Sequence, residues 1–488
     1  MSENQNLTLL TDLYELTMMQ GYYENHANET VIFDMFYRDN PYQSAYAITA
    51  GLEQVIDYIQ NLHFSEEDID YLRSTGFFHE GFLNYLRSFH FTGDIYAIPE
   101  GTVVFPREPL LKVIAPIMEA QLIEAAVLNI INHQSLIATK ASRVVHAAGG
   151  GVMEFGLRRA QGPDAGIYGA RASMIGGCVG TSNVLAGKMF DIPVKGTHAH
   201  SWVMSFKTEL EAFRAYAKLY PDNCLLLVDT YDTLESGVPH AIQVFDEMKA
   251  AGIHSKLYGI RLDSGDLAYL SKEARKMLDA AGYTDAVISA SSDLDEYLIE
   301  SLKGQGAQIT SWGVGTNLIT SKDCPAFGGV YKLAAIRKPD GTFKPKIKVS
   351  ENVTKVTNPG NKTIYRLYDK ETGKIKGDLI CLVGETYDPE ESLTIFDPVS
   401  TWKRTTLPGG TYTMRELLVP IFQNGQCVYT SPSVMEMRDY CTQEQNTLWD
   451  ESRRFANPQP VYVDLSKPLW NLKNELLDKV HEFKDKES

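Results

Sequence analysis

The middle of the chain, from Gly150 to about Gly329, alternates short apolar runs with longer amphipathic segments. The apolar runs are Val152–Phe155, Ile192–Val194, Leu225–Val228, Leu257–Leu262, Val287–Ile288 and Ile309–Val314. Between the later runs, apolar residues recur at the spacing of a helix that is buried on one face. Strand–helix units repeated at about 25–35 residues indicate a parallel sheet, because a helix makes the crossover between parallel strands. We expect an incomplete (β/α) barrel, with a doubly wound sheet as the alternative.

Each apolar run ends in a cluster of polar residues. These clusters are Gly156–Arg159, Gly196–His200, Asp229–Thr230, Asp263–Asp266, Ser291–Asp293 and Gly315–Asn317. In barrels and in doubly wound sheets alike, ligands bind at the carboxyl ends of the strands. The pattern therefore predicts that these clusters converge on one pocket.

The chain has 488 residues, more than one ordinary hydrophobic core organises, so two or three domains are expected. Residues 1–145 mix helical and strand-like segments and predict an N-terminal α+β domain. Residues 146–335 form the predicted barrel-like domain. Short strands with Gly and Pro turns follow over residues 336–410, and residues 411–488 form a C-terminal extension that ends in a charged helix.

Composition narrows the classes of function. The net charge of -16 argues against a nucleic-acid or membrane-surface partner, although a locally positive cleft can still bind small anions. Six cysteines without a C-x-x-C pair are typical of reduced, buried thiols. The N-terminus lacks the pattern of a signal peptide, and the apolar stretch Pro109–Ala138 carries charges that favour a buried helix over a membrane span. We expect a soluble, cytoplasmic protein.

The segment Gly259–Asp266 carries the first candidate chemistry. Asp263 and Asp266 can accept hydrogen bonds from ribose hydroxyls or hold the water shell of Mg²⁺, and Arg261 can neutralise an anion. Seen alone, the segment fits a helix N-cap with a surface ion pair equally well. The recurrence of polar residues at other strand ends favours the functional interpretation.

A second candidate is Gly313–Asn317, whose glycines allow the backbone to approach a phosphate closely. The alternative is an ordinary turn. The dinucleotide fingerprint G-x-G-x-x-G is not completed, because Leu318 stands in place of the third glycine.

Two further clusters carry histidines, an aromatic ring and arginines. On a strand, His198 and His200 would share a face. The alternatives are that they bind a metal together, that one of them carries a proton or attacks a phosphate, or that both are structural histidines. Phe155 can stack on a planar heterocycle or belong to the core, and Arg158 can pair with a carboxylate or a diphosphate.

Taken together, the sequence resembles the nicotinate phosphoribosyltransferase family. The resemblance spans nearly the whole chain and lies in the blocks Thr11–Met18, Phe36–Arg38, Glu154–Asp164, Gly196–Ser201, Gly259–Asp266, Gly313–Thr316, Gly328–Leu333 and Lys348–Glu351. It implies a type II phosphoribosyltransferase fold, in which residues 336–410 pack with the N-terminal domain. It also implies a homodimer with shared active sites.

The resemblance also implies roles for individual residues. Tyr14 from the partner subunit would stack on one face of the pyridine ring and Phe155 on the other. Thr197 and Arg261 would lie by nicotinate, with Arg158 near its carboxylate or the diphosphate. The ribose phosphate would lie at Gly315 and Thr316, and Asp293 is a further pocket candidate. His200 matches the phosphorylated histidine of the family, whereas His198 falls at a variable position.

The activity that the resemblance implies is the joining of nicotinate to 5-phosphoribosyl-1-diphosphate, with Mg²⁺ on the diphosphate and ATP as a co-substrate. The products would be nicotinate mononucleotide and diphosphate, the first step of NAD salvage from nicotinate. Related enzymes that use nicotinamide carry an aspartate where Ser182 stands in Gly180–Asn183, and its absence favours the acid substrate. Arg261, Asp263 and His200 are the predicted catalytic residues.

Three alternatives stay open from the sequence. A nicotinamide- or quinolinate-using phosphoribosyltransferase has the same class of fold. A barrel aldolase or phosphosugar isomerase also uses polar strand ends, and Lys195 is the barrel lysine near a strand end that a Schiff base would require. A non-catalytic binding protein explains the polar strand ends less well.

Overall fold

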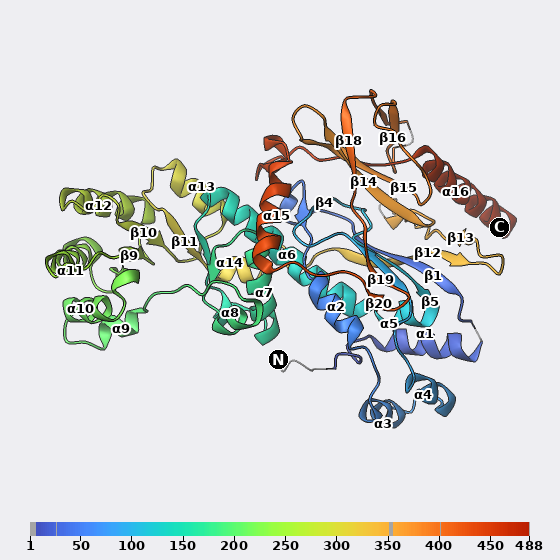
Figure 1. Cartoon of the computed structure of the whole chain (residues 1–488), viewed down its shortest axis with the longest axis horizontal. Coiled ribbons are helices and arrows are strands. Elements are labelled where there is room, and N and C mark those ends of the chain that lie inside the picture. The colour runs from blue at the N-terminus through green and yellow to red at the C-terminus, as the bar shows by residue number, and fades with distance from the viewer. Residues whose placement is uncertain (1–5, 26, 351–354, 401, 488) are drawn as a thin grey trace. The chain divides into compact units, whose positions relative to one another are not determined.

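The computed structural model describes residues 6–25, 27–350, 355–400 and 402–487. Glu351 of the block Lys348–Glu351 lies outside the described residues. The chain divides into two compact units, of which the first comprises Met1–Leu136 with Ala326–Ser488 and the second comprises Ile137–Pro325. Helix α6 (Glu124–Ala148) begins in the first unit and ends in the second (Figure 1).

The second unit is built on six parallel strands. Their order is β7 (Gly180–Thr181), β6 (Val152–Glu154), β11 (Ser311–Val314), β10 (Val287–Ala290), β9 (Tyr258–Leu262) and β8 (Cys224–Leu227). Strands β7 and β8 are the two edges of the sheet and do not pair with each other. The prediction of an incomplete barrel is therefore confirmed.

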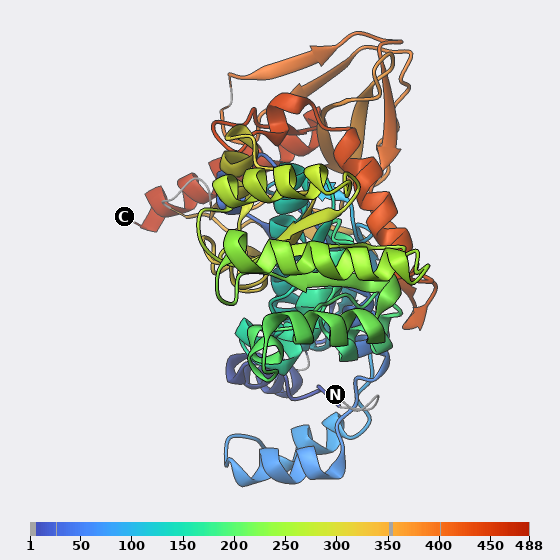
Figure 2. The ribbon, with the colours of Figure 1, turned by 90° about the vertical axis from the view of Figure 1, so that its left-hand side faces the viewer.

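Helices follow these strands, as the amphipathic pattern predicted. They are α7 (Pro163–Ile175), α8 (Val184–Phe190), α9 (His200–Met204), α10 (Glu209–Leu219), α11 (Val238–Ala250), α12 (Leu267–Ala280), α13 (Glu296–Gly304) and α14 (Thr316–Ile319). Figure 2 shows α10, α11 and α12 side by side on one face of the unit. In α12 the buried residues include Leu267, Ala274 and Leu278, which recur at helical spacing.

The first unit contains a seven-stranded antiparallel sheet. Its order is β13 (Phe343–Pro345), β12 (Gly329–Arg337), β1 (Thr30–Tyr37), β5 (Leu111–Pro116), β3 (Asp94–Ala97), β19 (Val419–Gln423) and β20 (Gln426–Cys427). Strands from both ends of the chain thus complete one sheet. A short pair, β2 (Ala47–Ile48) with β4 (Val103–Val104), lies apart from it.

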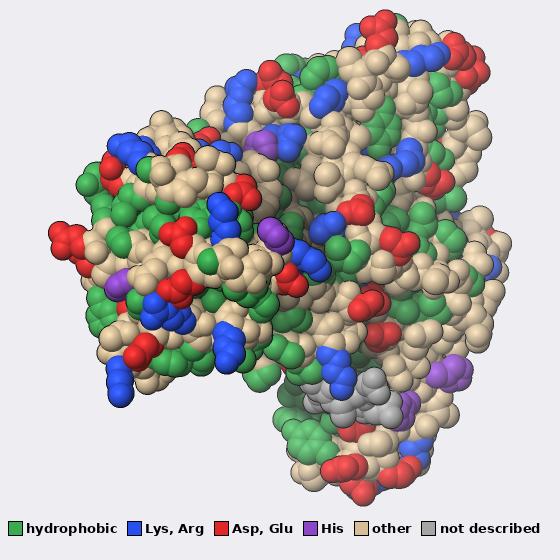
Figure 3. All heavy atoms as spheres, turned by 60° about the vertical axis from the view of Figure 1, so that its left-hand side comes forward, with side chains coloured by type: hydrophobic (Ala, Val, Ile, Leu, Met, Phe, Trp, Pro, Cys, Tyr) green, Lys and Arg blue, Asp and Glu red, His purple; other side chains and the backbone are tan. Residues whose placement is uncertain are grey.

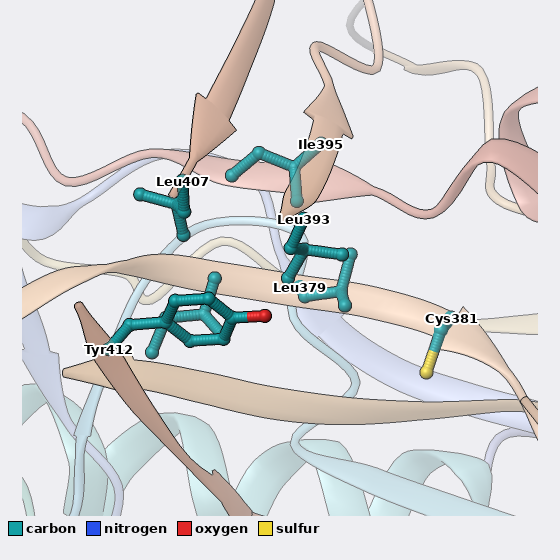
Figure 4. Close-up of a cluster of buried hydrophobic side chains, with 7 residues drawn as sticks. Leu379, Cys381, Leu393, Ile395, Leu407 and Tyr412 are labelled. Carbon is teal, nitrogen blue, oxygen red and sulfur yellow. The ribbon is translucent and has the colours of Figure 1, made fainter. Parts of the chain in front are cut away.

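A second sheet in the first unit has the order β17 (Arg404–Leu407), β16 (Leu393–Phe396), β21 (Val463–Leu465), β15 (Ile375–Leu382), β14 (Lys362–Asp369) and β18 (Tyr412–Glu416). One of its faces buries a hydrophobic cluster of aliphatic side chains around Tyr412, of which six members are labelled in Figure 4. Burial of such side chains stabilises a sheet by about 1.5–3 kcal/mol each.

The helices of the first unit are α1 (Leu13–Glu24), α2 (Leu52–Gln60), α3 (Glu66–Ser74), α4 (Glu80–Leu86), α5 (Ile117–Leu122), α15 (Val434–Asn446) and α16 (Lys467–Glu487), together with the start of α6. In α2 the buried residues include Val55, Ile56 and Ile59, which lie on one face at helical spacing. The interpretation of Pro109–Ala138 as helix throughout is wrong at its start. Residues Leu111–Pro116 form β5, between β1 and β3, because a short and mostly apolar run fits a buried central strand as well as a helix.

Among the described residues, no helix combines the length and the apolar character that crossing a membrane requires. On the face shown in Figure 3, basic side chains are interspersed with acidic ones. That face therefore offers no continuous basic surface to a nucleic acid.

Candidate active site

Four of the side chains singled out by the sequence lie together in the second unit. Arg261, at the end of β9, donates through Nη1 to the hydroxyl of Thr197 and, at 3.3 Å, to the carbonyl of His198. The Asp263 carboxylate lies 3.6 Å from Arg261 Nη2 and 3.7 Å from His200 Nε2. The loop before α9 and the end of β9 therefore form one polar cluster, which we call the β9 cluster.

Arg261 is held in a partly desolvated position. Burial lowers the pKa of its guanidinium, and the carboxylates of Asp263 and Asp229 oppose that change. The charge of Arg158 acts in the same direction as burial, so the two arginines face a common region. Two guanidinium groups in one region suit a ligand that carries more than one negative charge.

The β9 cluster includes residues whose importance the sequence did not show. Asp229 Oδ2 accepts hydrogen bonds from the Asp263 amide at 2.8 Å and from the Ser264 hydroxyl at 2.7 Å. The Thr230 hydroxyl lies 3.1 Å from His200 Nδ1. The sequence signal was the polar pair Asp229–Thr230, which directly follows the apolar run Leu225–Val228. Only the parallel pairing of β8 with β9 brings that pair beside the cluster.

The two histidines have different environments, because His198 lies in a loop and His200 is the first residue of α9, so the segment is not a strand. His198 is buried, its Nε2 accepts from the Leu227 amide at 3.2 Å, and its ring packs edge-on against Tyr216. Burial lowers the pKa of His198 to about 4, so the ring is neutral at physiological pH. His198 has the features of a structural histidine, whereas His200 faces the β9 cluster.

Phe155 follows β6, and its ring lies against Gly313 in β11. A Cβ added to Gly313 would come within 2.6 Å of the Phe155 ring and 3.5 Å of Ser291. The Ser291 hydroxyl in turn donates to Asp263. Glycine at position 313 thus lets the aromatic ring approach the same strand end that supports the β9 cluster.

A buried carboxylate holds the loop that includes Ser182. Glu154, at the end of β6, accepts hydrogen bonds from the Gly156 amide and, at 2.6 Å, from the Thr181 hydroxyl. Burial raises the pKa of Glu154, and both hydrogen bonds oppose the rise. The backbone before Phe155 and the backbone around Ser182 are therefore tied together.

The strand ends of β10 and β11 are also linked. Asn317 donates through Nδ2 to the carbonyl of Asp293 at 2.9 Å, and Gly315 immediately precedes Thr316, the first residue of α14. Ser292, the residue before Asp293, has a φ of 132°, in a region that favours glycine. Such strain persists only where the surrounding structure imposes it, and it concentrates at ligand sites.

Two sequence candidates have other surroundings. Asp266 Oδ1 accepts a hydrogen bond from the Tyr269 amide at 3.0 Å and caps α12. For this residue the alternative interpretation of the segment, a helix N-cap, is the one observed. Lys195 is exposed, unlike the desolvated lysines that form Schiff bases. Within the described ranges, no group of three or more His, Cys, Asp or Glu side chains is arranged to hold a metal ion.

Tyr14 belongs to the first unit and lies in the first turn of α1, with 47% of its surface exposed. Burial of its remaining surface and the carboxylates of Glu124 and Glu15 raise its pKa, so the phenol stays neutral. Leu13 and Met18 on the same helix are also exposed. This end of α1 therefore presents an apolar surface with an aromatic ring.

Comparison with known proteins identifies the family. The model of the nicotinate phosphoribosyltransferase N-terminal domain matches residues 9–132, the nicotinate phosphoribosyltransferase family model matches residues 151–361, and the model of the C-terminal domain matches residues 361–473. A nicotinate phosphoribosyltransferase of Bacillus subtilis (strain 168) is 46% identical over 486 residues, which cover 99% of this chain and 97% of that protein. The chain belongs to the nicotinate phosphoribosyltransferase family.

Other members of the family are similar over nearly their whole length. The nicotinate phosphoribosyltransferase of Homo sapiens is 31% identical, over 96% of each chain. The crystal structure of human nicotinic acid phosphoribosyltransferase matches with a TM-score of 0.83 at 29% identity, over 96% of this chain and 99% of that one. A nicotinate-nucleotide pyrophosphorylase from Pyrococcus furiosus shares the fold, with a TM-score of 0.68 over 91% and 96% of the two chains. The resemblance and the class of fold inferred from the sequence are both confirmed.

Proposed function

We propose that this protein joins nicotinate to 5-phosphoribosyl-1-diphosphate and releases nicotinate mononucleotide and diphosphate. The observation that carries the proposal is the β9 cluster, in which Arg261, Asp263 and His200 meet at the carboxyl ends of parallel strands. Family membership supports the choice of substrates. The reaction would be the first step of NAD salvage from nicotinate, carried out in the cytoplasm.

Nicotinate is flat, aromatic and anionic. In our proposal the ring of Phe155 stacks on the pyridine, and Arg158 and Arg261 attract the carboxylate. Thr197, which is hydrogen-bonded to Arg261, fixes the orientation of that guanidinium. Ser182 adds no negative charge to the region, so a carboxylate substrate is not repelled as it would be by an acid.

The sugar diphosphate would lie on the β10 and β11 side. Gly315 and Thr316 approach the 5-phosphate, Asp293 lines the pocket, and Asp263 accepts from the ribose hydroxyls. The pyridine nitrogen then attacks the anomeric carbon as the bond to diphosphate breaks, and Asp263 stabilises the positive charge that develops on the ribose. No general base is required, because the pyridine nitrogen is unprotonated at neutral pH.

The residues present fit a Mg²⁺ ion bound with the diphosphate. Asp229 Oδ1 is buried without a hydrogen-bond partner among the described residues, and carboxylate oxygens are the ligands that Mg²⁺ prefers. Asp229 and Asp263 would hold the ion. When bound, Mg²⁺ neutralises charge on the departing diphosphate.

ATP would act through His200. The Thr230 hydroxyl orients the imidazole through Nδ1, and the His200 side chain is 38% exposed, so ATP can transfer its γ-phosphate to the ring. Hydrolysis of this phosphohistidine would couple ATP to tighter substrate binding and to a higher product yield.

We further propose a homodimer with shared active sites. The exposed residues Leu13, Tyr14 and Met18 on α1 support a contact with a second copy of the chain. Tyr14 of that copy would then complete the aromatic sandwich around nicotinate.

The deciding experiment measures diphosphate release with nicotinate and with nicotinamide, each with and without ATP. We expect release with nicotinate, stimulation by ATP, and little release with nicotinamide. A parallel assay with quinolinate tests whether this third pyridine compound is the substrate instead. If no pyridine substrate releases diphosphate, the proposed function is wrong.

The roles of His200 and Tyr14 have separate tests. His200→Ala should lose ATP coupling and keep a slow ATP-independent reaction, and an unchanged ratio of ATP hydrolysed to product formed would refute the assignment. Tyr14→Ala and Asp263→Ala chains, each inactive alone, should regain activity when mixed into heterodimers. Mixing without recovery would argue against shared sites.

A further inference from the structure

Glu154, the last residue of β6, closes a tight turn around Phe155. Its Oε1 accepts a hydrogen bond from the amide of Gly156, two residues further along the chain. A Cβ at Gly156 would lie 2.9 Å from that oxygen and would overlap Ile319, so the turn requires glycine. The Glu154 carboxylate therefore holds the backbone that carries the half-buried Phe155.

Thr181, the last residue of β7, closes the same kind of turn around Ser182. Its hydroxyl oxygen accepts from the amide of Asn183, again two residues further along the chain, at 3.0 Å. The Asn183 side chain accepts from the Ala186 amide at 3.1 Å and caps α8. Ser182 is half-buried and is thus the central residue of a turn that leads directly into a helix.

One hydrogen bond joins the two turns. The Thr181 hydroxyl donates to Glu154 Oε2 at 2.6 Å, and both residues are fully buried. The Ser182 amide also donates to the Glu154 carbonyl at 2.9 Å. These bonds form one network, which we call the Glu154 network and which consists of Glu154, Gly156, Thr181 and Asn183.

The backbone alone holds Ser182 weakly. Strand β7 has two residues, so it makes two register pairs with β6 and, on its other side, a single bridge from Thr181 to Val194. Water does not replace a lost donor in a buried position, so removal of the Thr181 hydroxyl would leave Glu154 Oε2 unsatisfied. The side-chain bond therefore adds substantially to a short strand pairing.

We propose that Glu154 and Thr181 are positioning residues that fix Phe155 and Ser182 relative to each other, and thereby set the affinity for nicotinate. In the proposed function Phe155 stacks on the pyridine ring, and Ser182 lies in the region of the carboxylate. Two groups that face one small ligand bind it well when they are held in place before it arrives. The inference rests on the proposed function, since it assumes that nicotinate occupies this region.

The test compares Thr181→Val, which keeps the shape of threonine without the hydroxyl, with Thr181→Ser, which keeps the hydroxyl. We expect Thr181→Val to raise the nicotinate KM about tenfold, the effect of losing a hydrogen bond to a charged group. Thr181→Ser should keep a nicotinate KM close to that of the parent. In both variants kcat and the KM for 5-phosphoribosyl-1-diphosphate should change little, because they depend on the β9 cluster.

A matched control lies in the first unit. Thr363 is also a buried threonine whose hydroxyl donates to a glutamate, Glu416, at 2.5 Å. Thr363→Val removes the same kind of bond and should leave the nicotinate KM unchanged. Equal rises in Thr181→Val and Thr363→Val would show that a general loss of stability causes the effect, which would overturn the proposal.

Glu154→Gln changes the other partner of the bond. Glutamine has one acceptor oxygen in place of two, so it cannot accept from both donors as the carboxylate does, and the nicotinate KM should rise again. The double variant with Thr181→Val should be no worse than the worse single variant, because both changes break one network. Multiplication of the two effects to about a hundredfold would contradict the proposal.

The remaining outcomes separate the inference from the proposed function. An unchanged nicotinate KM in a folded Thr181→Val protein refutes the positioning role and leaves the proposed function intact. If Thr181→Val does not fold, Glu154→Gln decides by the same measurement against Thr363→Val. A parent protein that releases no diphosphate from nicotinate refutes the proposed function, and the inference with it.

Discussion

Both units contain an arginine surrounded by carboxylates. The two clusters differ in how far their side chains are exposed and in which hydrogen-bonding groups remain for a ligand. In the first unit Arg366 is fully buried, with Asp378 at 2.7 Å, Glu444 at 3.2 Å and Glu108 at 4.0 Å. In the second unit the β9 cluster around Arg261 is partly open, and the side chains of Asp263 and His200 are 35% and 38% exposed. The same residue types therefore occur in a closed cluster and in an open one.

The contrast shows how a structural charge cluster differs from a candidate site. Arg366 directs Nε, Nη1 and Nη2 to carboxylates, so its donors are used within the protein, although Glu108 Oε1, 4.0 Å from Arg366 Nη2, makes no hydrogen bond to the described residues. In the β9 cluster, Arg261 Nε and Asp229 Oδ1 are buried and have no hydrogen-bond partner among the described residues. Unused hydrogen-bonding capacity at a strand end is what a ligand can satisfy.

The largest effect expected from this comparison is on stability. Arg366→Met would leave Asp378 and Glu108 buried without their cation, at a cost of about 3–5 kcal/mol, whereas Glu444 would keep its ion pair with Arg415. Thermal unfolding followed by circular dichroism should show a large fall in Tm. A Tm equal to that of the parent would mean that the closed cluster contributes little to stability.

The second prediction concerns the open cluster and affects activity instead. Asp263→Asn should lower kcat/KM for nicotinate by about 10²–10³-fold, because it removes charge that stabilises the transition state, and should leave Tm almost unchanged. Asp266→Asn is the matched control, since asparagine also caps a helix and the variant should keep most of the activity. Equal losses in the two variants would show that the segment acts through its fold alone.

A third prediction uses Glu15, a buried carboxylate of the first unit without a cationic partner among the described residues. Burial raises its pKa to about 7 from 4.5. A carboxyl whose folded-state pKa is raised stabilises the fold below the unfolded value and loses that contribution as pH rises through the folded value. The parent should therefore lose about 2 kcal/mol relative to Glu15→Gln between about pH 4.5 and 7.

Denaturant unfolding of the parent and of Glu15→Gln across this pH range measures the effect. Taking the difference between the two proteins removes the contributions of the other titrating groups. A difference that stays constant with pH would show that Glu15 does not change its protonation state in that window.

The smallest effect is expected at an exposed pair. Arg214 and Glu247 form an ion pair at 2.6 Å on the surface of the second unit, with side-chain exposures of 44% and 41%. Because solvent screens such pairs, Arg214→Ala should shift neither Tm nor the kinetic constants measurably. A clear fall in Tm or in activity would mean that exposure alone does not distinguish charged side chains that stabilise the protein from those that contribute nothing.

The site was predictable where the pattern was local. Asp263 and His200 stand out because they belong to polar clusters that follow apolar runs, and Arg261 stands out because it lies two residues before Asp263. Thr230 belonged to such a cluster but was given no role, and Glu154 was given none either, since their importance depends on contacts to residues 30 and 27 positions away. The environments of His198 and His200 were also missed, because residues 196–199 are a loop, where alternation does not apply.

The sequence by itself determined the class of fold and the family, because the period of apolar residues and the order of the blocks are carried by consecutive residues. It did not determine that strands from both ends of the chain complete the sheet around β1, nor that one arginine is closed in and another left open. Those features depend on the pairing of distant strands and on the burial that follows. Only the tertiary structure therefore decided which charged residues are satisfied within the protein and which have capacity left for a ligand.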